Sequence, residues 1–315
     1  MTVPSQELIG SVTAESGIGG TAVLDETRIP SRGSVILRRF FRQKRAIAGL
    51  VILVILVLLA FVGVHATKWG YNQPDFQSFL VKPQFKFSRS SHWFGTDSAG
   101  LDLYAETMRG AQKSIIIGLL VALMATGLAA IVGAAAGYFG RWVDRVLMWF
   151  VDLLLVIPSF LIVAILSPHY HNNLKLFVFL LGMFIWQITA RIVRGQTLSL
   201  REREYVLAAK YMGVPGPRIV LRHILPNLAS LLIIDATVNV SVAVLTETGL
   251  SFFGFGVQPP DVSLGTLIGA ADTSATTQPW LFLFPAGFLV LLLLGVNLVG
   301  QGLRDAFDPS SGRAL

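Results

Sequence analysis

Six apolar stretches run along the chain, each long enough to cross a lipid bilayer as a helix, and polar segments of unequal length separate them. A membrane-spanning helix needs about 20 consecutive, mostly apolar residues. The pattern therefore predicts an all-α integral membrane protein with six transmembrane helices. The predicted helices cover residues 46–64, 114–138, 147–166, 174–190, 228–245 and 280–299.

The composition supports a membrane protein. Hydrophobic residues make up 53% of the 315 residues, charged residues make up 14%, and the mean hydropathy is +0.66, whereas soluble domains carry about 25% charged residues. The chain has no cysteine, which excludes disulfides and thiolate metal sites. The first apolar stretch lies well inside the chain without a small-residue cleavage site after it, so we expect a retained anchor and not a signal peptide.

The placement of Lys and Arg predicts the orientation of the helices. Basic residues precede the first stretch and fill the segment between the fourth and fifth stretches, whereas residues 250–279 contain none. We therefore expect the N-terminus in the cytoplasm and, with six spans, the C-terminus there too. Residues 65–113 are expected outside despite six basic residues, because long loops are weak evidence for this rule. The net charge of +7 is interpreted as a topology signal and not as nucleic-acid binding.

The polar segment between the fourth and fifth stretches is predicted to form two short helices. Ser199 and Glu202 have the spacing of a capping box, so the first helix is expected to begin there. Gly213 supplies the left-handed position that ends many helices. A second helix, 218–225, is expected to stop before Pro226. Two short helices projecting from a membrane protein suit a docking element.

The same segment resembles the cytoplasmic loop of ABC importer permeases. That loop has Glu-Ala-Ala, three residues, Gly, nine residues and Ile-x-Leu-Pro, and the Ala-Ala, Gly and Leu-Pro positions match here at full spacing. Leu207 replaces the family's Glu and His223 its Ile, and Glu204, one turn earlier, is the candidate substitute for the missing carboxylate. An ordinary cytosolic helical hairpin is the alternative. The residues that the resemblance assigns to ATPase coupling are Glu204, Leu207, Ala208, Ala209, Gly213, His223, Leu225 and Pro226.

The segment after the fifth stretch resembles dipeptide and oligopeptide permeases in particular. Those proteins have a Glu followed by Ser-Phe-Leu-Gly-Leu-Gly-Val-Gln-Pro-Pro, and this chain has Glu247 followed by SFFGFGVQPP. Glycines permit backbone bends and Pro259-Pro260 forces an extended exit, so we expect a half-inserted outer gate. A generic re-entrant loop is the alternative. The candidate gate residues are Glu247, Phe252, Phe253, Gly254, Gly256 and Gln258.

The segment before the second stretch also resembles the peptide permeases, whose His-x-x-Gly-Thr-Asp-x-x-Gly-x-Asp pattern matches from His92 to Asp102. Taken alone, His92, Asp97 and Asp102 could indicate a metal site. Their spacing on a Gly-containing loop favours a turn in which Asp side chains accept backbone hydrogen bonds. His169 and His171, in a short outer turn, are likewise interpreted as solvated and not as metal ligands.

Two of the membrane stretches contain a carboxylate, which is costly there unless it faces water or a partner. Asp235, Asn239 and Thr246 share a face at helical spacing. They are candidates for a translocation path that binds the charged amine of a peptide, and an interhelical hydrogen-bond network is an equal alternative. Asp152 is interpreted as the partner of Arg145 near the inner membrane surface.

Small residues are frequent in the second stretch. Gly133 and Gly137 have the spacing that lets another helix approach closely. That helix is expected either in this chain or in a second permease subunit.

The resemblance covers most of residues 34–310 and implies a type I ABC importer permease fold in the bacterial inner (plasma) membrane. It implies the C-type subunit of a dipeptide/oligopeptide/nickel importer, paired with a homologous B-type permease, one or two P-loop ATPase subunits and an extracytoplasmic substrate-binding protein. The chain contains no G-x-x-x-x-G-K-[ST] motif, so ATP and Mg are expected on the partner ATPases only, with no cofactor and no catalysis in this chain. Alternatives are other small cargo, such as a nickel chelate or glutathione, and an ion-driven secondary transporter using Asp152 and Asp235. The latter would show an internal repeat, which is not seen.

The chain is expected to divide into four parts. They are a disordered cytoplasmic tail at 1–33, a basic anchor with the first helix at 34–66, an extracytoplasmic segment at 67–113, and a core of five helices at 114–310 with the coupling loop 191–226 and the gate segment 247–278.

Overall fold

The structure is a computed structural model that describes residues 32–84, 88–167 and 173–307. Within these ranges every regular element is a helix, and one isolated bridge joins Thr96 and Asp102. The predicted all-α fold is confirmed. The expectations for His169, His171 and nearly all of the N-terminal tail fall outside the described ranges, although helix α1 (Arg32–Arg42) begins inside the range expected to be tail.

The helices that are long and apolar enough to cross a membrane make six crossings, if each bent pair is counted as one. Four crossings are single helices or continuous helical runs, and two are pairs of shorter helices. The crossings are α2 (Lys44–Phe61), α3 (Leu103–Phe139), α4 (Arg141–Val156) with α5 (Ser159–Leu166), α6 (Leu174–Met183) with α7 (Gln187–Leu200), α10 (Leu225–Phe252) with the helical turns before it, and α12 (Pro279–Phe307).

Local chemistry explains the two bends. The bend of 73° between α4 and α5 occurs at Pro158, because proline excludes the residue before it from the helical region, and Ile157 is extended. The bend of 49° between α6 and α7 contains no proline. There the side chains of Trp186 and Gln187 each donate to the carbonyl of Met183 at 3.0 Å. These hydrogen bonds satisfy a backbone acceptor at the end of α6.

Several predicted helix limits were wrong, because an apolar window does not register where a helix begins and ends: α7 continues to Leu200 and α12 to Phe307, beyond the predicted residues 190 and 299. Helix α3 begins at Leu103 and not near residue 114, since the Asp102 carboxylate accepts from the backbone N–H of Ala105 at 3.0 Å and caps the helix. Helix α10 continues to Phe252, well beyond residue 245.

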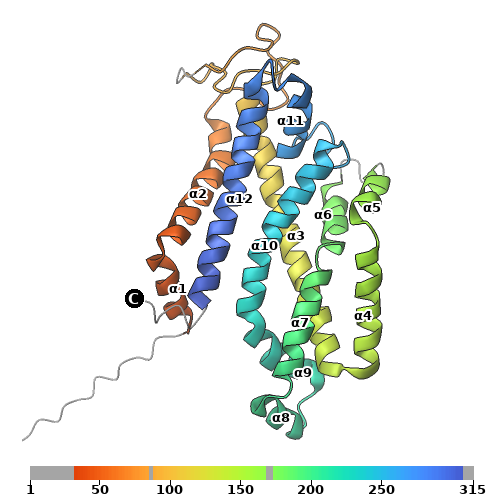
Figure 1. Cartoon of the computed structure of the whole chain (residues 1–315). Coiled ribbons are helices and arrows are strands. Elements are labelled where there is room, and N and C mark those ends of the chain that lie inside the picture. The colour runs from red at the N-terminus through yellow and green to blue at the C-terminus, as the bar shows by residue number, and fades with distance from the viewer. Residues whose placement is uncertain (1–31, 85–87, 168–172, 308–315) are drawn as a thin grey trace, which may run out of the picture.

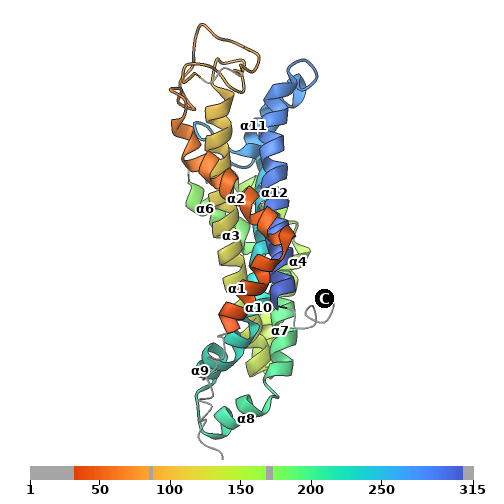
Figure 2. The same cartoon turned by 90° about the vertical axis from the view of Figure 1, so that its left-hand side faces the viewer.

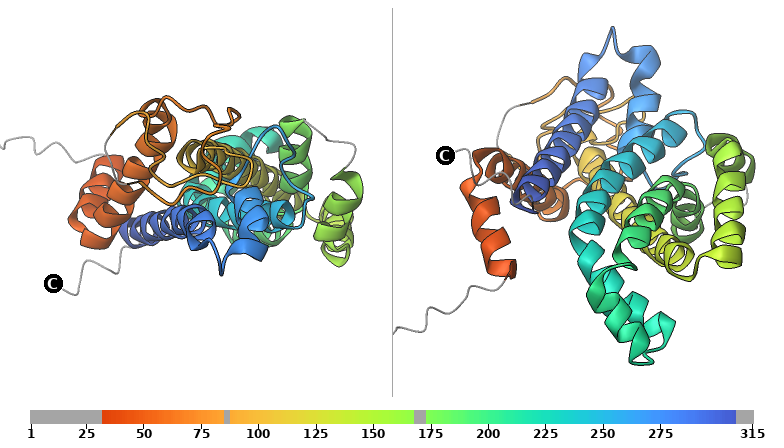
Figure 3. Two further views of the ribbon diagram at one scale, coloured as in Figure 1. Left: turned by 90° about the horizontal axis from the view of Figure 1, so that it is seen from above. Right: turned by 60° about the horizontal axis from the view of Figure 1, so that its bottom comes forward.

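The helices form one elongated bundle (Figure 1). Helices α2 and α12 pack side by side along one edge, α3 and α10 lie in the centre, and α4 with α5 forms the opposite edge. Helices α8 (Glu204–Tyr211) and α9 (Gly216–Ile219) project beyond one end, as Figure 2 and the right panel of Figure 3 show. Residues 67–84 and 88–102, together with α11 (Leu264–Ala271), cover the other end. The core shared by the central helices, α2, α11 and α12 includes Leu56, Met108, Val244, Leu264 and Leu292.

Helices α3 and α7 approach each other closely because α3 presents glycines to α7. A Cβ atom at Gly133 would lie 2.5 Å from the carbonyl oxygen of Ala190, and one at Gly137 would lie 2.7 Å from Cβ of Thr197. The helix expected beside these glycines is therefore a helix of this chain.

This packing predicts that Gly133→Ala destabilises the protein, because the added methyl group meets the backbone of α7. Overpacking of this kind costs about 1–3 kcal/mol. The matched control is Gly127→Ala on the same helix, where a Cβ meets nothing within 4 Å. Thermal unfolding in detergent should show a lower midpoint for the first variant and no decrease for the second; equal midpoints would contradict the close contact.

Candidate functional site

The projecting hairpin, residues 201–224, begins differently from the prediction. Helix α7 continues to Leu200, so Ser199 lies in its last turn and does not cap α8. The chain reverses over residues 201–203, and Arg203 occupies the N-cap position of α8 without a side-chain cap. The predicted capping box is therefore wrong, because helix α7 extends through the position where the new helix was expected to start.

The end of α8 agrees with the prediction. Gly213 has a φ of 79°, the left-handed region that disfavours residues with a Cβ atom. Its N–H donates to the carbonyl of Lys210 at 3.0 Å, and the N–H of Val214 donates to that of Ala209 at 3.1 Å. This pair of bonds is a Schellman motif, which satisfies the last carbonyls of the helix.

The second short helix does not stop before Pro226. Helix α9 passes into a π-helical turn, Val220–Ile224, and this turn leads directly into α10. Pro226 lies in the first turn of α10, where a residue without an N–H is tolerated. The hairpin and the fifth crossing are thus one continuous helical run.

The predicted coupling residues differ in how exposed their side chains are. Ala209 is buried in a cluster with Val206, Ile219 and Ile224, so it holds α8 against α9, whereas Ala208 is exposed. The other coupling candidates spread over the hairpin and the start of α10. Glu204 and Pro226 are exposed, and Leu207, His223 and Leu225 are half-buried.

The hairpin also carries exposed apolar side chains that the motif comparison missed. Tyr211 is 84% exposed, Met212 is 76% exposed and Leu221 is 63% exposed. The signal in the sequence was the pair of large apolar residues directly before Gly213. Ala208, Tyr211 and Met212 share one face at helical spacing, and these three residues with the exposed Leu221 are called here the hairpin surface.

A cavity of about 470 Å³ lies among α5, α6, α7 and α10. Asp235, Asn239 and Thr246 all line it, so the three predicted face-sharing residues do converge on one space. Most of the remaining wall is apolar, with Phe160, Leu181 and other large side chains.

The carboxylate of Asp235 is also hydrogen-bonded to three helices. One oxygen accepts from the Thr189 hydroxyl at 2.8 Å, and the other accepts from Thr126 at 3.2 Å and from Asn239 at 2.8 Å. No ion pair among the described residues includes Asp235. The carboxyl group is therefore held in place by neutral donors and has no cationic partner among the described residues beside the cavity.

Asp152 lies outside this cavity and pairs with Arg191 of α7, not with the predicted Arg145. An ion pair was the correct interpretation, but its partner comes from another helix. A second pair, Asp144 with Arg194, links the same two helices through two hydrogen bonds. Both pairs attach α4 to α7.

The predicted gate residues lie at the end of α10 and in the turn after it. Phe253 packs edge-to-face against Phe160 of α5 at a centroid distance of 5.9 Å, and Phe252 packs against Phe253 at 5.2 Å. Gly254 is left-handed, and the Gln258 side chain donates to its carbonyl at 2.7 Å. Gly256 packs directly on Ser251, since a Cβ there would lie 2.0 Å from the Ser251 hydroxyl oxygen.

Glu247 lies beneath the gate turn and not in the cavity. It is fully buried and accepts from the Ser251 hydroxyl at 2.7 Å and from the Ser114 hydroxyl of α3 at 2.9 Å. These hydroxyls accept in turn from the backbone N–H groups of Val257, at 3.1 Å, and Leu264, at 3.4 Å. Glu247 therefore organises the gate from below and does not contact the cavity.

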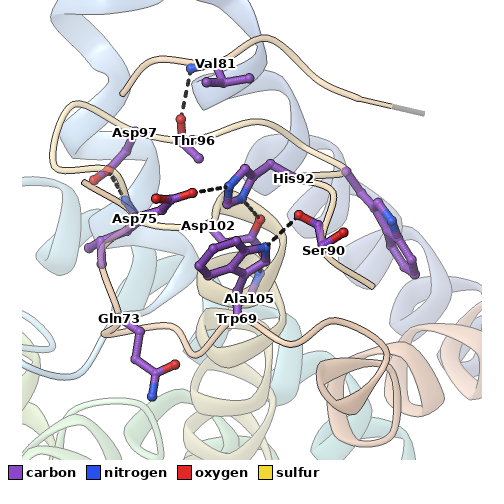
Figure 4. A network of polar contacts seen from close by, with 12 residues as sticks. Trp69, Gln73, Asp75, Val81, Ser90, His92, Thr96, Asp97, Asp102 and Ala105 are labelled. Atoms are coloured by element: carbon purple, nitrogen blue, oxygen red, sulfur yellow. Dashed lines mark hydrogen bonds and ion pairs between the residues drawn. The ribbon is translucent and has the colours of Figure 1, made fainter. Parts of the chain in front are cut away.

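The segment before α3 forms a network around a buried histidine (Figure 4). His92 stacks on Trp69 and lies between Asp102, at 2.8 Å, and Asp75, at 3.4 Å. Asp97 accepts from the backbone N–H groups of residues 99 and 101, which confirms the interpretation of this loop as an Asp-stabilised turn. Among the described residues no group of three acidic or histidine side chains could hold a metal ion.

The pKa values of two carboxyl groups in this network shift in opposite directions. Burial raises the pKa of Asp102, and the hydrogen bond from His92 opposes that rise. The backbone N–H of Gln77 and the hydroxyl of Ser78 lower the pKa of Asp75, with a smaller contribution from His92.

One ionic contact connects the gate segment to α3. Asp261 accepts from Arg109 at 2.9 Å and from Lys113 at 2.7 Å, and Arg109 also lies over the ring of Tyr71. Partial burial works against ionisation of Asp261, but the two cationic donors hold its pKa below the usual range.

Residues 129–313 match the family model described as binding-protein-dependent transport system inner membrane component. Residues 31–83 match the N-terminal TM domain of oligopeptide transport permease C. The chain is 53% identical to the oligopeptide transport system permease protein OppC of Mycobacterium tuberculosis, over 90% of this chain and 97% of that protein. It is 38% identical to the protein of the same name from Haemophilus influenzae, over 86% of each chain.

The Asp261 contact predicts a pH-dependent contribution to stability. The folded pKa lies below the ordinary value of 3.8, so the contact stabilises the fold above that pH and is lost as the pH falls through the folded pKa. Wild type should therefore unfold at a higher temperature than Asp261→Asn at neutral pH, and the difference should shrink below about pH 4. Exposed Asp272, changed to Asn, is the control and should leave the midpoint unchanged. A difference that is independent of pH would contradict the ionic contact.

Proposed function

This chain belongs to the family of binding-protein-dependent transport system inner membrane components, and on that premise we propose that it is the C-type permease subunit of an ATP-driven importer of di- and oligopeptides. The observation that carries the proposal is the hairpin surface, which projects from one end of the bundle and is not covered by any described part of the chain. An exposed apolar patch of this kind fits a site for another protein.

Peptide cargo is supported by the names of the relatives and by the cavity. The Mycobacterium and Haemophilus relatives are oligopeptide transport system permeases by name. In this chain Asp235 places an unpaired carboxylate at the wall of a largely apolar cavity. Such a wall suits a peptide, because the carboxylate attracts an ammonium group and the apolar residues accept side chains of varied shape.

The energy source is proposed to lie in partner subunits. The chain has no P-loop motif, so ATP and Mg would be bound by one or two P-loop ATPase subunits that dock on the hairpin surface. A homologous B-type permease would complete the transport path, and an extracytoplasmic binding protein would deliver the peptide at the opposite end. No cofactor is assigned to this chain itself.

The continuity of the hairpin with α10 supports a direct coupling route. Movement of the ATPases would shift the hairpin, and the helical run through the π-helical turn would carry that shift to Asp235 and to the gate at Phe252. Alternating access requires that each partner contact the two states differently, which a docked rigid hairpin can provide.

The main alternative is cargo of another kind carried by the same machinery, such as a nickel chelate or glutathione. An ion-driven transporter is a weaker alternative, because Asp152, one of its two required acids, is half exposed and already paired with Arg191.

Pull-down of the tagged protein from mild detergent tests the docking site. Ala208→Glu should release the ATPase subunits while the partner permease is retained, because the new charge lies on the exposed face of α8. Ala99→Glu is the matched control, since Ala99 is exposed at the opposite end of the bundle. Ala209→Glu is unsuitable because Ala209 is buried. Equal recovery of the ATPases with Ala208→Glu and with Ala99→Glu would show that the hairpin is not the docking site. In a separate uptake assay, transport by this chain alone without ATP would favour the ion-driven alternative.

Transport assays in proteoliposomes test the coupling route. Gly213→Val forces a β-branched residue into the left-handed region, at a cost of about 1–2 kcal/mol, although a Cβ there meets nothing within 4 Å. The end of α8 should therefore distort, and peptide uptake should fall severalfold further than ATP hydrolysis does. The control is Gly195→Val in α7, where a Cβ also meets nothing and the backbone is helical. Normal uptake by the Gly213 variant would show that the hairpin does not transmit the movement.

A further inference from the structure

A pocket of about 260 Å³ lies at the end of the bundle opposite the hairpin. The beginning of α3, helix α11, the loop after α11 and the beginning of α12 form its walls. It shares no lining residue with the cavity beside Asp235. Its polar lining consists of Asp97, Ser98, Glu106, Thr273, Ser274 and Gln278. This space is called here the outer pocket.

Glu106 gives the outer pocket its chemistry. The side chain lies in the first turn of α3, is only 4% exposed and lines the pocket. No hydrogen bond or ion pair to its carboxyl group occurs within the described residues. A buried carboxylate without a partner is costly, and the positive end of the α3 dipole offsets only part of that cost.

The charges around Glu106 increase the demand for a cation. Burial first, and then the charges of Asp97 and Asp102, raise the pKa of Glu106 to about 8, and a cation bound in the pocket would lower that pKa again. One oxygen of Asp97 accepts two backbone N–H groups, from Ala99 and Leu101, and has no capacity left for a ligand. Arg109, one turn along α3, is already bound to Asp261 in the gate segment. The pocket therefore presents two acidic side chains, and none of its lining residues is a lysine or an arginine.

The size and shape of the site limit the occupant. Pockets that enclose drug-sized ligands measure about 300–1,000 Å³, so a pocket of about 260 Å³ suits one side chain better than a whole oligopeptide. A lysine has a compact charge on a flexible four-carbon stem, whereas the planar arginine fork needs a bidentate acceptor. Two acidic groups on different elements, one of them with a single available oxygen, match the lysine ammonium better.

We propose that the outer pocket receives one lysine side chain of the extracytoplasmic binding protein, whose ammonium group pairs with Glu106 and Asp97. This inference rests on the proposed function, because it requires a binding protein that docks at the end of the bundle opposite the ATPases. It adds a specific contact to that function: one buried charge pair at the outer surface, separate from the cargo cavity.

The test measures the affinity of the complete transporter, reconstituted in lipid nanodiscs, for the binding protein that co-purifies with the wild-type complex. Glu106→Gln should weaken the affinity about 30-fold or more, mainly through faster dissociation, because one partner of a buried pair is lost. The matched control is Asp272→Asn, which removes an exposed acid beside the pocket that does not line it, and should change the affinity less than about twofold. The thermal unfolding midpoint of each variant shows whether the permease remains folded.

A second measurement leaves the permease unchanged. Each surface lysine of the binding protein is replaced by Gln in turn. One of these variants should bind the wild-type permease about 30-fold more weakly or worse, as the wild-type binding protein binds Glu106→Gln. The same lysine variant should bind Glu106→Gln with no further loss of affinity, because the charge pair is already absent. Full affinity of the Glu106→Gln complex, or additive losses for every lysine, would overturn the inference. Loss of peptide transport without loss of binding-protein affinity would also overturn it and would assign the pocket to cargo. If no binding protein associates with the wild-type transporter, the proposed function itself fails, which distinguishes the two results.

Discussion

The arrangement of the half of the bundle opposite the hairpin depends on the hydrogen bonds of the buried Glu247 carboxyl group. A carboxyl group with no exposed surface is tolerated only when hydrogen bonds from the protein replace those to water. Here Ser114 of α3 and Ser251 of α10 supply them, and the same hydroxyls receive the N–H groups of the gate turn and of the first residue of α11. Helix α3 is thereby joined to the end of α10, the gate turn and the start of α11 around one side chain, and the gate turn, which has little regular structure, has a defined position.

Each end of α10 is connected to a different kind of structure. At its beginning the helix continues from the hairpin through a π-helical turn, and near its other end it carries Glu247 and then the gate aromatics. Asp235 lies between them, at the cavity wall and bonded to α3 and α7. The close α3–α7 packing at Gly133 and Gly137 makes those two helices a fixed support for this carboxylate.

The sequence was sufficient for features that depend on local pattern. Long apolar stretches predicted the crossings, a single glycine predicted the end of α8 at residue 213, and closely spaced Asp and Gly residues predicted the turn at Asp97. Features that depend on neighbours distant in sequence could not be predicted from the sequence. The partner of Asp152, the burial of Ala209 and the position of Glu247 below the gate are all set by helices that pack from elsewhere in the chain. Glu106 gave no signal at all, since an acid in the first helical turn is ordinary and only the folded chain shows that it has no partner.

The length of α10 has a geometric consequence. Its 28 residues span about 42 Å at 1.5 Å per residue. If the helix turned as a rigid rod about its hairpin end, a rotation of about 5° would displace the gate end by about 4 Å. A small angular change at the hairpin would thus become a displacement at the gate end that is about as large as the contact distance between two packed side chains. Because Glu247 fixes the gate turn to that same rod, the displacement would reach Phe252 and Phe253 without loss along the way.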